Sequence, residues 1–267
     1  RAQAGTAGLS DQVRELSEDM PPVALVTGAA KRVGRALALN LAGDGWAVGV
    51  HYATSRAEAE RTAAEVEAAG GRAATLQADL TDEGACQALV DRAGRALGPV
   101  GLLVNNAAVF EYDTAETATR DSWDRHLETN LRAPFVLAQG LVRQLPEGRR
   151  GMIVNLLDGY VLQPAAGFAS YHLSKAGLYS LTQSLALQFA PDVRVNAIGP
   201  GALLPDHYRD QAAIQAAHRE TPLKRGTDPD EIYRTLRFFL DAPSVTGQMV
   251  ALDGGRHLGP SRQGDEV

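Results

Sequence analysis

The stretch LVTGAAKRVGRALA, residues 25–38, runs from an apolar segment through two glycines into a helical pattern. This order suits a dinucleotide pyrophosphate, because the backbone can approach the phosphates at the glycines and a helix N-terminus offers free amides and the positive end of its dipole. Two glycines alone are weak evidence, but these follow the first apolar run and precede further strand and helix patterns. We therefore predict a dinucleotide-binding loop in an α/β protein.

Short apolar runs alternate with longer helical patterns along the rest of the chain. Such alternation predicts parallel strands joined by right-handed helical crossovers, so we expect a doubly wound parallel sheet with helices on both faces, in one domain over residues 22–258. The seven predicted strands are Val23–Thr27, Ala47–His51, Ala73–Ala78, Gly101–Val104, Gly151–Leu156, Val193–Ala197 and Gln248–Leu252. The predicted helices lie near Val33–Ala42, Ser55–Ala69, Glu83–Leu97, Ser122–Leu145, Gly167–Phe189 and Pro229–Leu240.

The composition of the 267-residue chain is that of an ordinary globular protein, with 45% hydrophobic and 22% charged residues. Its net charge of −6 argues against nucleic acid or an anionic membrane as the main partner and favours a small molecule. The single cysteine, Cys86, cannot form an internal disulfide, and no Cys/His cluster has zinc-ligand spacing. No apolar run approaches the roughly 20 residues that span a bilayer. We expect a cytoplasmic protein that binds no metal.

Three segments lie outside the main pattern. Residues 1–21 lack the apolar centre of a secretory signal and are predicted to be a flexible leader, and residues 259–267 a mobile tail. Residues 202–226 mix apolar and charged residues, which predicts short helices over the carboxyl ends of the strands. Ligands bind at those ends in such sheets, so this segment is a candidate substrate lid; a surface excursion without ligand contact is the alternative.

Positive charge in the glycine loop bears on which dinucleotide binds. Gly28 and Gly34 bracket a segment in which Arg32 replaces the usual inner glycine and follows Lys31. The second predicted strand ends VGVHYATSR, without the acidic residue that would bind an unphosphorylated ribose and repel a 2′-phosphate. We predict NADPH rather than NADH; the alternative is that the two basic residues only solvate the loop. The predicted cofactor-binding residues are Gly28, Lys31, Arg32, Val33, Gly34, His51, Tyr52, Ser55, Asp79, Leu80, Asn106, Ala107 and Ala108.

Two polar residues at strand ends have a second interpretation. Asp79 either meets an adenine amino group or caps the next helix, whose expected N-cap is Thr81 or Asp82. Asn106 is expected to hold neighbouring backbone in place rather than to do chemistry.

Tyr171 and Lys175 are four residues apart in a predicted helix and so share one face, and Asp158 precedes the tyrosine by thirteen residues. An ammonium group near a phenol favours the phenolate, so we expect a tyrosine pKa lowered toward working pH, which suits proton transfer. Such a tyrosine and lysine alone are commonly an exposed pair without a catalytic role, but the nucleotide loop upstream favours catalysis.

Five motifs together resemble the short-chain dehydrogenase/reductase superfamily: TGAAKRVG, NNAA, the asparagine in LETNLRAPF, YHLSK and VRVNAIGPG. The resemblance runs from about Val23 to Leu258. It implies a Rossmann-type fold, a nicotinamide cofactor and a homotetramer.

The same resemblance implies roles for single residues. Tyr171 would be the general acid, and Lys175 would hold the nicotinamide ribose and tune that tyrosine. Asn130 would anchor a water-linked proton path by disturbing its helix. Pro200 and Gly201 would flank the nicotinamide.

Asp158 stands where most of that superfamily has a serine that hydrogen-bonds a substrate carbonyl. A carboxylate cannot donate unless it is protonated, and it would repel a developing alkoxide, so ordinary ketone reduction is disfavoured. A substrate with basic ring nitrogens can instead use the carboxyl group as a proton source through the tyrosine. The alternative role of Asp158 is a turn or helix cap in LLDGY.

This exchange, with GAAKRVGR, HYATSRAEAE and a phenylalanine after NNAAV, resembles pteridine reductases and bacterial dihydromonapterin or dihydrofolate reductases. By that likeness Phe110 would stack on a pterin, although a core position is its alternative, and Arg32 would contact both pyrophosphate and pterin. Ala108 stands where pteridine reductases carry a serine. The predicted substrate residues are Phe110, Arg32, Asp158, Tyr171, Leu203, Leu204 and Tyr208, with His207 as a further wall residue.

The sequence thus predicts an NADPH-dependent reductase that transfers hydride to a C=N bond of a pterin. One alternative is a carbonyl reductase acting on an aldehyde, quinone or ketone. Another is a non-catalytic binding protein that senses NADPH.

Overall fold

The sheet contains seven parallel strands in the order β3-β2-β1-β4-β5-β6-β7 in the computed structural model, which describes residues 19–164, 166–205 and 207–259. The strands are β1 (Val23–Val26), β2 (Ala47–Tyr52), β3 (Ala73–Gln77), β4 (Leu102–Asn105), β5 (Gly151–Leu156), β6 (Val193–Pro200) and β7 (Met249–Leu252). The α-helices are α2 (Arg32–Gly43), α3 (Arg56–Ala68), α4 (Glu83–Leu97), α5 (Arg120–Leu127), α6 (Ala133–Gln144), α7 (Ala169–Gln188), α8 (Gln211–Glu220) and α9 (Pro229–Asp241). Shorter turns of helix are the π-helical η1 (Glu128–Arg132) and the 3-10 helices η2 (Gly159–Val161) and η3 (Arg256–Leu258).

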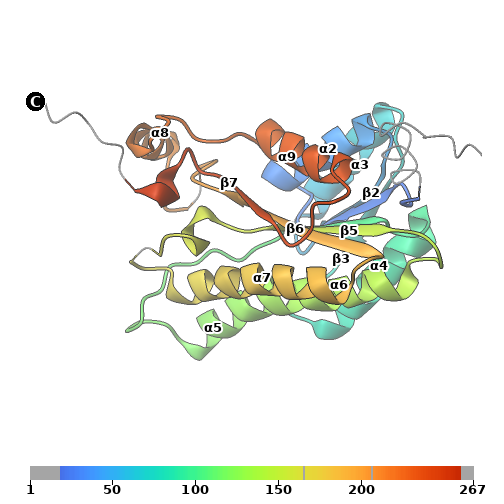
Figure 1. The fold of residues 1–267 in the computed structure, drawn as a ribbon, viewed down its shortest axis with the longest axis horizontal. Helices are drawn as coiled ribbons and strands as arrows, with labels where there is room; N and C mark the ends of the chain where they lie inside the picture. The colour runs from blue at the N-terminus through green and yellow to red at the C-terminus, as the bar shows by residue number, and fades with distance from the viewer. Residues whose placement is uncertain (1–18, 165, 206, 260–267) are drawn as a thin grey trace, which may run out of the picture.

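Helices cover both faces of the sheet, with α2, α3 and α9 on one side and α4 to α7 on the other (Figure 1). Every residue of β1, β4 and β5 is buried, as expected for central strands covered on both faces. The predicted Rossmann-type, doubly wound parallel sheet is therefore confirmed. Because the strand order reverses between β1 and β4, a crevice opens at their carboxyl ends, which is where ligands bind in such sheets.

Two predicted helices differ in detail. The helix predicted over Ser122–Leu145 is divided, because the π-helical η1 separates α5 from α6. It also begins at Arg120, since Thr119 and Ser122 form a capping box. The helix predicted from Gly167 begins at Ala169, because Phe168 has left-handed backbone angles and ends the preceding loop.

The predicted leader is wrong at its end. Met20 and Pro21 are buried, and the Arg150 amide donates to the Asp19 carbonyl at 3.2 Å, so these residues pack against the domain. Residues 1–18 and 260–267 of the predicted leader and tail lie outside the described residues. In the predicted lid, α8 forms the expected short helix. No helix within the described ranges is long and apolar enough to cross a membrane.

The glycine loop after β1 depends on a close backbone approach. Gly28 has φ +64, and a Cβ atom added to Gly34 would lie 2.2 Å from the Gly28 carbonyl oxygen. The first turn of α2 therefore lies against the loop with no room for a side chain at position 34. No side chain caps this turn, so its amides are open to an anion.

We expect Gly34→Ala to lower the free energy of unfolding by about 2–3 kcal/mol, because the new methyl group overlaps rigid backbone. The matched control is Gly43→Ala at the other end of α2, where nothing lies within 4 Å of the added atom. That control is expected to stabilise by about 0.5–1 kcal/mol. Urea unfolding measures both; equal effects at the two positions would contradict the close approach.

Candidate active site

A cavity of about 350 Å³ lies where the loop after β1 meets the end of β2 and the start of the segment after β4. Its lining contains most of the predicted cofactor residues, together with Ala30, Ala53 and Thr54, which sequence reasoning missed because small residues leave no charge pattern. The lining residues are Gly28, Ala30, Lys31, Arg32, Val33, Gly34, Tyr52, Ala53, Thr54, Ser55, Asn106, Ala107 and Ala108.

The residues of this cavity fit a phosphorylated dinucleotide. The first turn of α2 has no side-chain cap, so its amides can bind a pyrophosphate. Lys31 adds a cation, although Glu58 lies 3.9 Å from its ammonium group. Asn106 does what was predicted of it: its side-chain amide donates to the Thr27 carbonyl at 2.8 Å and holds the loop.

Arg32 lies between this cavity and a second one. It has φ +55, a left-handed conformation in which glycine is usual, and so it adopts the backbone of the glycine that it replaces. Its guanidinium donates to the carbonyls of Pro205 at 2.5 Å and Leu204 at 3.4 Å, at the start of the lid. Arg32 thus ties the phosphate loop to the lid and lines both cavities.

His51 is not at the cavity wall, contrary to the prediction. It is 1% exposed, and its Nδ1 accepts the Gly28 amide proton at 3.0 Å while Nε2 lies 3.1 Å from the Ala78 carbonyl oxygen. The imidazole is therefore neutral, with its proton on Nε2. Burial is the main cause that lowers the pKa of His51 from 6.5 to about 4. The residue supports the glycine loop from behind.

Asp79 and Leu80 also lie outside the cavity lining. The Oδ1 atom of Asp79 accepts from the Thr81 amide at 2.9 Å and the Thr81 hydroxyl at 2.8 Å, and these bonds lower its pKa. Helix α4 is capped by Asp82, which was one of the two expected caps, so Asp79 caps no helix. Leu80 is buried in the core.

The second cavity, of about 750 Å³, opens at the carboxyl ends of β5 and β6 beneath the lid. It brings together all the predicted substrate residues except Tyr208. Gly201, which was predicted to flank the nicotinamide, also lines this cavity, and Pro200, the last residue of β6, directly precedes Gly201. The sequence did not indicate Val109, Glu111, Pro205 or Arg209. The lining residues are Arg32, Ala108, Val109, Phe110, Glu111, Asp158, Tyr171, Gly201, Leu203, Leu204, Pro205, His207 and Arg209.

Asp158 and Tyr171 form a direct hydrogen bond in this cavity. The Tyr171 hydroxyl donates to Asp158 Oδ2 at 3.1 Å, while Oδ1 accepts the Tyr160 amide proton at 2.9 Å and caps η2. Both roles considered for Asp158, cap and tyrosine partner, are thus present, one on each oxygen. Burial is the main cause that raises the pKa of this carboxyl group above its usual value.

The expected lowering of the tyrosine pKa is not found. Burial first, and then the charge of Asp158, raise the pKa of Tyr171 well above 10. Lys175 does not offset this, because its ammonium group lies 5.9 Å from the centre of the tyrosine ring and donates instead to the Leu156 carbonyl at 2.8 Å. Burial lowers the pKa of Lys175 to about 8. The tyrosine is therefore held in its protonated form.

Asn130 lies in η1, so the expected disturbance of its helix is present as a π-helical turn. Its side chain is fully used: Oδ1 accepts from the Val109 amide at 2.8 Å, and Nδ2 donates to the Val109 carbonyl at 2.9 Å and to Ser174 Oγ at 3.0 Å. The amide group thus joins the segment after β4 to α7.

Aromatic rings pack around Phe110 at the wall of the larger cavity. Phe110 stacks face to face on Phe168, with centroids 4.4 Å apart, and makes edge-to-face contacts with Tyr171 at 4.7 Å and with Tyr208 at 5.6 Å. Tyr208 therefore joins the site through its ring rather than through the cavity lining. Sequence reasoning missed Phe168, whose left-handed backbone turns it toward the site.

Comparison with known proteins gives concordant results. Residues 22–215 match the short chain dehydrogenase family. The crystal structure of FolM alternative dihydrofolate reductase 1 from Brucella suis in complex with NADP is 39% identical, covers 91% of this chain and 99% of its own, and has a TM-score of 0.87. The corresponding protein of Brucella canis, also complexed with NADP, is 38% identical over 93% and 99% of the two chains, with a TM-score of 0.85. The 3-oxoacyl-[acyl-carrier-protein] reductase FabG of Staphylococcus epidermidis is 32% identical over 88% of this chain and 98% of its own.

The buried His51 predicts a pH dependence of stability. Because its pKa is about 4 in the folded protein and 6.5 when exposed, only the unfolded chain takes up the proton between these values. The contribution of His51 to the free energy of unfolding is therefore fully present above pH 6.5, and it falls by up to about 3 kcal/mol as the pH drops toward 4. In His51→Asn an amide oxygen can accept from Gly28 without titrating. Unfolding measured from pH 7.5 to pH 4.5 should show a smaller loss in this variant; parallel curves would contradict the assignment.

Proposed function

The chain belongs to the short chain dehydrogenase family and is an oxidoreductase, and from this premise we propose that it uses NADPH to reduce a C=N bond of a pterin. The observation that carries the proposal is the hydrogen bond from the Tyr171 hydroxyl to the Asp158 carboxylate at the wall of the 750 Å³ cavity.

The choice of NADPH is supported by the cavity at the glycine loop and by the two Brucella structures, which hold NADP. Lys31 and Ser55 would face the 2′-phosphate end of the cofactor, and no acidic residue lines this cavity. The first-turn amides of α2 would hold the pyrophosphate, and Pro200 and Gly201 would flank the nicotinamide. When bound, this cofactor supplies the hydride.

Proton delivery falls to the chain's own residues. Because its pKa is raised, Tyr171 is protonated when the substrate binds and can donate that proton to it. Once it donates, the tyrosine can be reprotonated through the neighbouring Asp158, because the raised pKa of this carboxyl group lets it take up a proton from solvent more readily than an ordinary aspartate and pass it on. A pterin nitrogen is basic and accepts such a proton, whereas a carbonyl substrate would instead need a neutral hydroxyl donor beside the tyrosine.

The wall of the cavity supports a flat ring as substrate. Phe110 already stacks on the planar ring of Phe168, so its shape and position suit an aromatic heterocycle. The two Brucella relatives are named alternative dihydrofolate reductase 1, and dihydrofolate contains a pterin. We propose dihydrobiopterin, dihydromonapterin or dihydrofolate as the substrate type.

A carbonyl reductase is the second candidate, favoured by the likeness to the FabG of Staphylococcus epidermidis, a 3-oxoacyl reductase. Against it stands Asp158, because in its ionised form, which accepts the Tyr171 hydroxyl proton, this carboxylate would repel the alkoxide formed from a ketone. The residues after β6 and after β4 that line the 750 Å³ cavity would then bind the acyl chain of a substrate rather than a ring.

We also propose a homotetramer in the cytoplasm. A groove whose exposed surface is mainly apolar runs between η1, α6 and α7, where Leu131, Phe135 and Leu181 lie. A second copy packed against this groove would cover it.

Exchange of the aspartate tests the proposal. We expect Asp158→Ser to lower kcat/KM for a dihydropterin by about 100-fold, because the second proton source is lost, while activity on ketones is unchanged or higher. Tyr171→Phe should abolish turnover of either substrate class and leave the Kd for NADPH within about threefold. Steady-state NADPH oxidation and fluorescence titration measure the two quantities. Loss of ketone activity with intact pterin activity in Asp158→Ser would overturn the proposal.

A further inference from the structure

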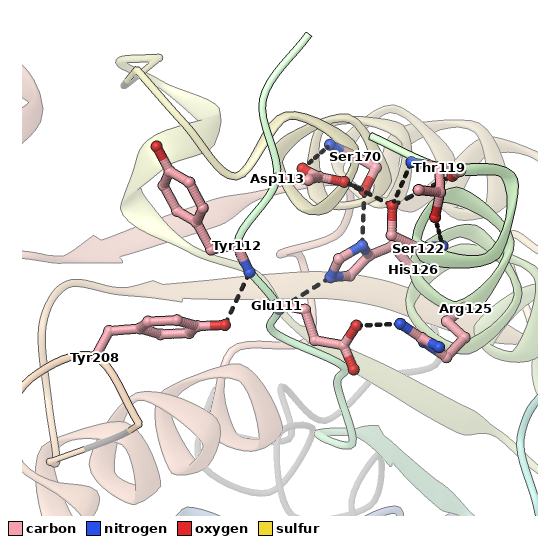
Figure 2. Close-up of polar contacts among 9 residues, drawn as sticks. All are labelled: Glu111, Tyr112, Asp113, Thr119, Ser122, Arg125, His126, Ser170 and Tyr208. Atoms are coloured by element: carbon pink, nitrogen blue, oxygen red, sulfur yellow. Dashed lines mark hydrogen bonds and ion pairs between the residues drawn. The ribbon is translucent and has the colours of Figure 1, made fainter. Parts of the chain in front are cut away.

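Residues 109–113 carry Phe110 along the wall of the larger cavity, and we name them the substrate loop. Polar contacts tie this loop to other elements at nearly every residue. The Val109 amide donates to Asn130 Oδ1 at 2.8 Å. The other contacts are the Glu111 amide with His126 Nε2 at 3.1 Å, the Tyr112 amide with the Tyr208 hydroxyl at 2.8 Å, and the Asp113 carboxylate with Ser122 and Ser170 (Figure 2).

Only one assignment of donors and acceptors is consistent with the two hydrogen bonds of the His126 ring. Its Nε2 accepts the Glu111 amide proton, so in the neutral imidazole the proton is on Nδ1. Nδ1 lies 2.7 Å from Ser170 Oγ, which therefore accepts from His126 and turns its own proton to the Asp113 carboxylate. Figure 2 shows the imidazole between the loop and the serine. One neutral histidine thus connects the substrate loop to the first turn of α7, one residue before Tyr171.

The surroundings of His126 favour its neutral form. The side chain is 0% exposed, and burial is the main cause that lowers its pKa below 6.5. The negative charges of Asp113 and Glu111 in the loop, and the Ser122 carbonyl in the same helix as His126, raise this pKa. The positive charge of Arg125 lowers it further, and Arg125 forms an ion pair with Glu111 at 2.5 Å. From α7, the Tyr171 ring faces the imidazole at 6.0 Å.

We propose that His126 is a positioning residue for the substrate: by holding the Glu111 amide and Ser170 together, it sets where the Phe110 ring lies relative to the Tyr171 hydroxyl. The two rings meet at 4.7 Å, edge to face, and Phe110 is the residue next to the held amide. Loss of the bond to Glu111 would free the stacking ring and leave the tyrosine and the cofactor cavity in place. The proposal deepens the proposed function, on which its kinetic consequence rests.

Two substitutions separate the two bonds of the imidazole. The amide of glutamine reaches the position of Nε2 and can accept from Glu111, whereas that of asparagine reaches only the position of Nδ1 and can donate to Ser170. We expect His126→Asn to raise the KM for a dihydropterin about tenfold, with kcat and the Kd for NADPH within about twofold. His126→Gln should keep KM within about threefold. Wild-type KM should also rise as the pH falls through the lowered pKa of His126, and His126→Gln should lack this rise.

Amide hydrogen exchange of the NADPH complex, without substrate, tests the same contact independently of turnover. Exchange at Glu111 should be about tenfold faster in His126→Asn than in wild type, and His126→Gln should restore its protection. Equal exchange in the two variants would overturn the positioning role, as would KM values that rise equally in both. If the wild-type protein reduces no pterin but the exchange difference is found, the proposed function fails while the positioning of the loop stands.

Discussion

Parallel pairing brings the carboxyl ends of β1, β4, β5 and β6 to one edge of the sheet, and the chemistry of the protein depends on this placement. The glycine loop follows β1, the substrate loop follows β4, Asp158 follows β5, and the lid follows β6. Each segment leaves the sheet at the same edge, so groups far apart in sequence come within hydrogen-bond distance. Arg32 and the Leu204 and Pro205 carbonyls, which come from opposite halves of the chain, are an example.

Burial at that edge determines the protonation states. Tyr171 and Lys175 are almost fully buried, and desolvation disfavours the charged form of each. The same effect raises the pKa of Asp158 despite the hydrogen bonds that it accepts. A tyrosine that keeps its proton beside a carboxyl group that readily takes one is suited to donate to a basic nitrogen. The buried β1, β4 and β5 strands provide the core that supports these groups.

The fold and much of the site could be predicted from local patterns. Apolar runs alternating with helical periods indicated the sheet, and the spacing of Gly28, Tyr171 and Lys175 indicated where ligands bind. The position of His51 could not be read this way, because the strand pattern does not say that its imidazole turns inward to the Gly28 amide. The contacts of His126 likewise join residues 15 and 44 positions away, and no local pattern reports them. Helix boundaries differed where capping by Thr119 or the left-handed Phe168 decided them.

The central claim is that Asp158 and Tyr171 form a proton source for a C=N bond. The most direct measurement is the absorbance of NADPH during incubation of the wild-type protein with dihydrobiopterin, dihydromonapterin and dihydrofolate, beside a panel of aldehydes, quinones and ketones. The account predicts saturable oxidation of NADPH with at least one pterin and little with the carbonyl compounds. Saturable turnover confined to the carbonyl compounds would contradict it.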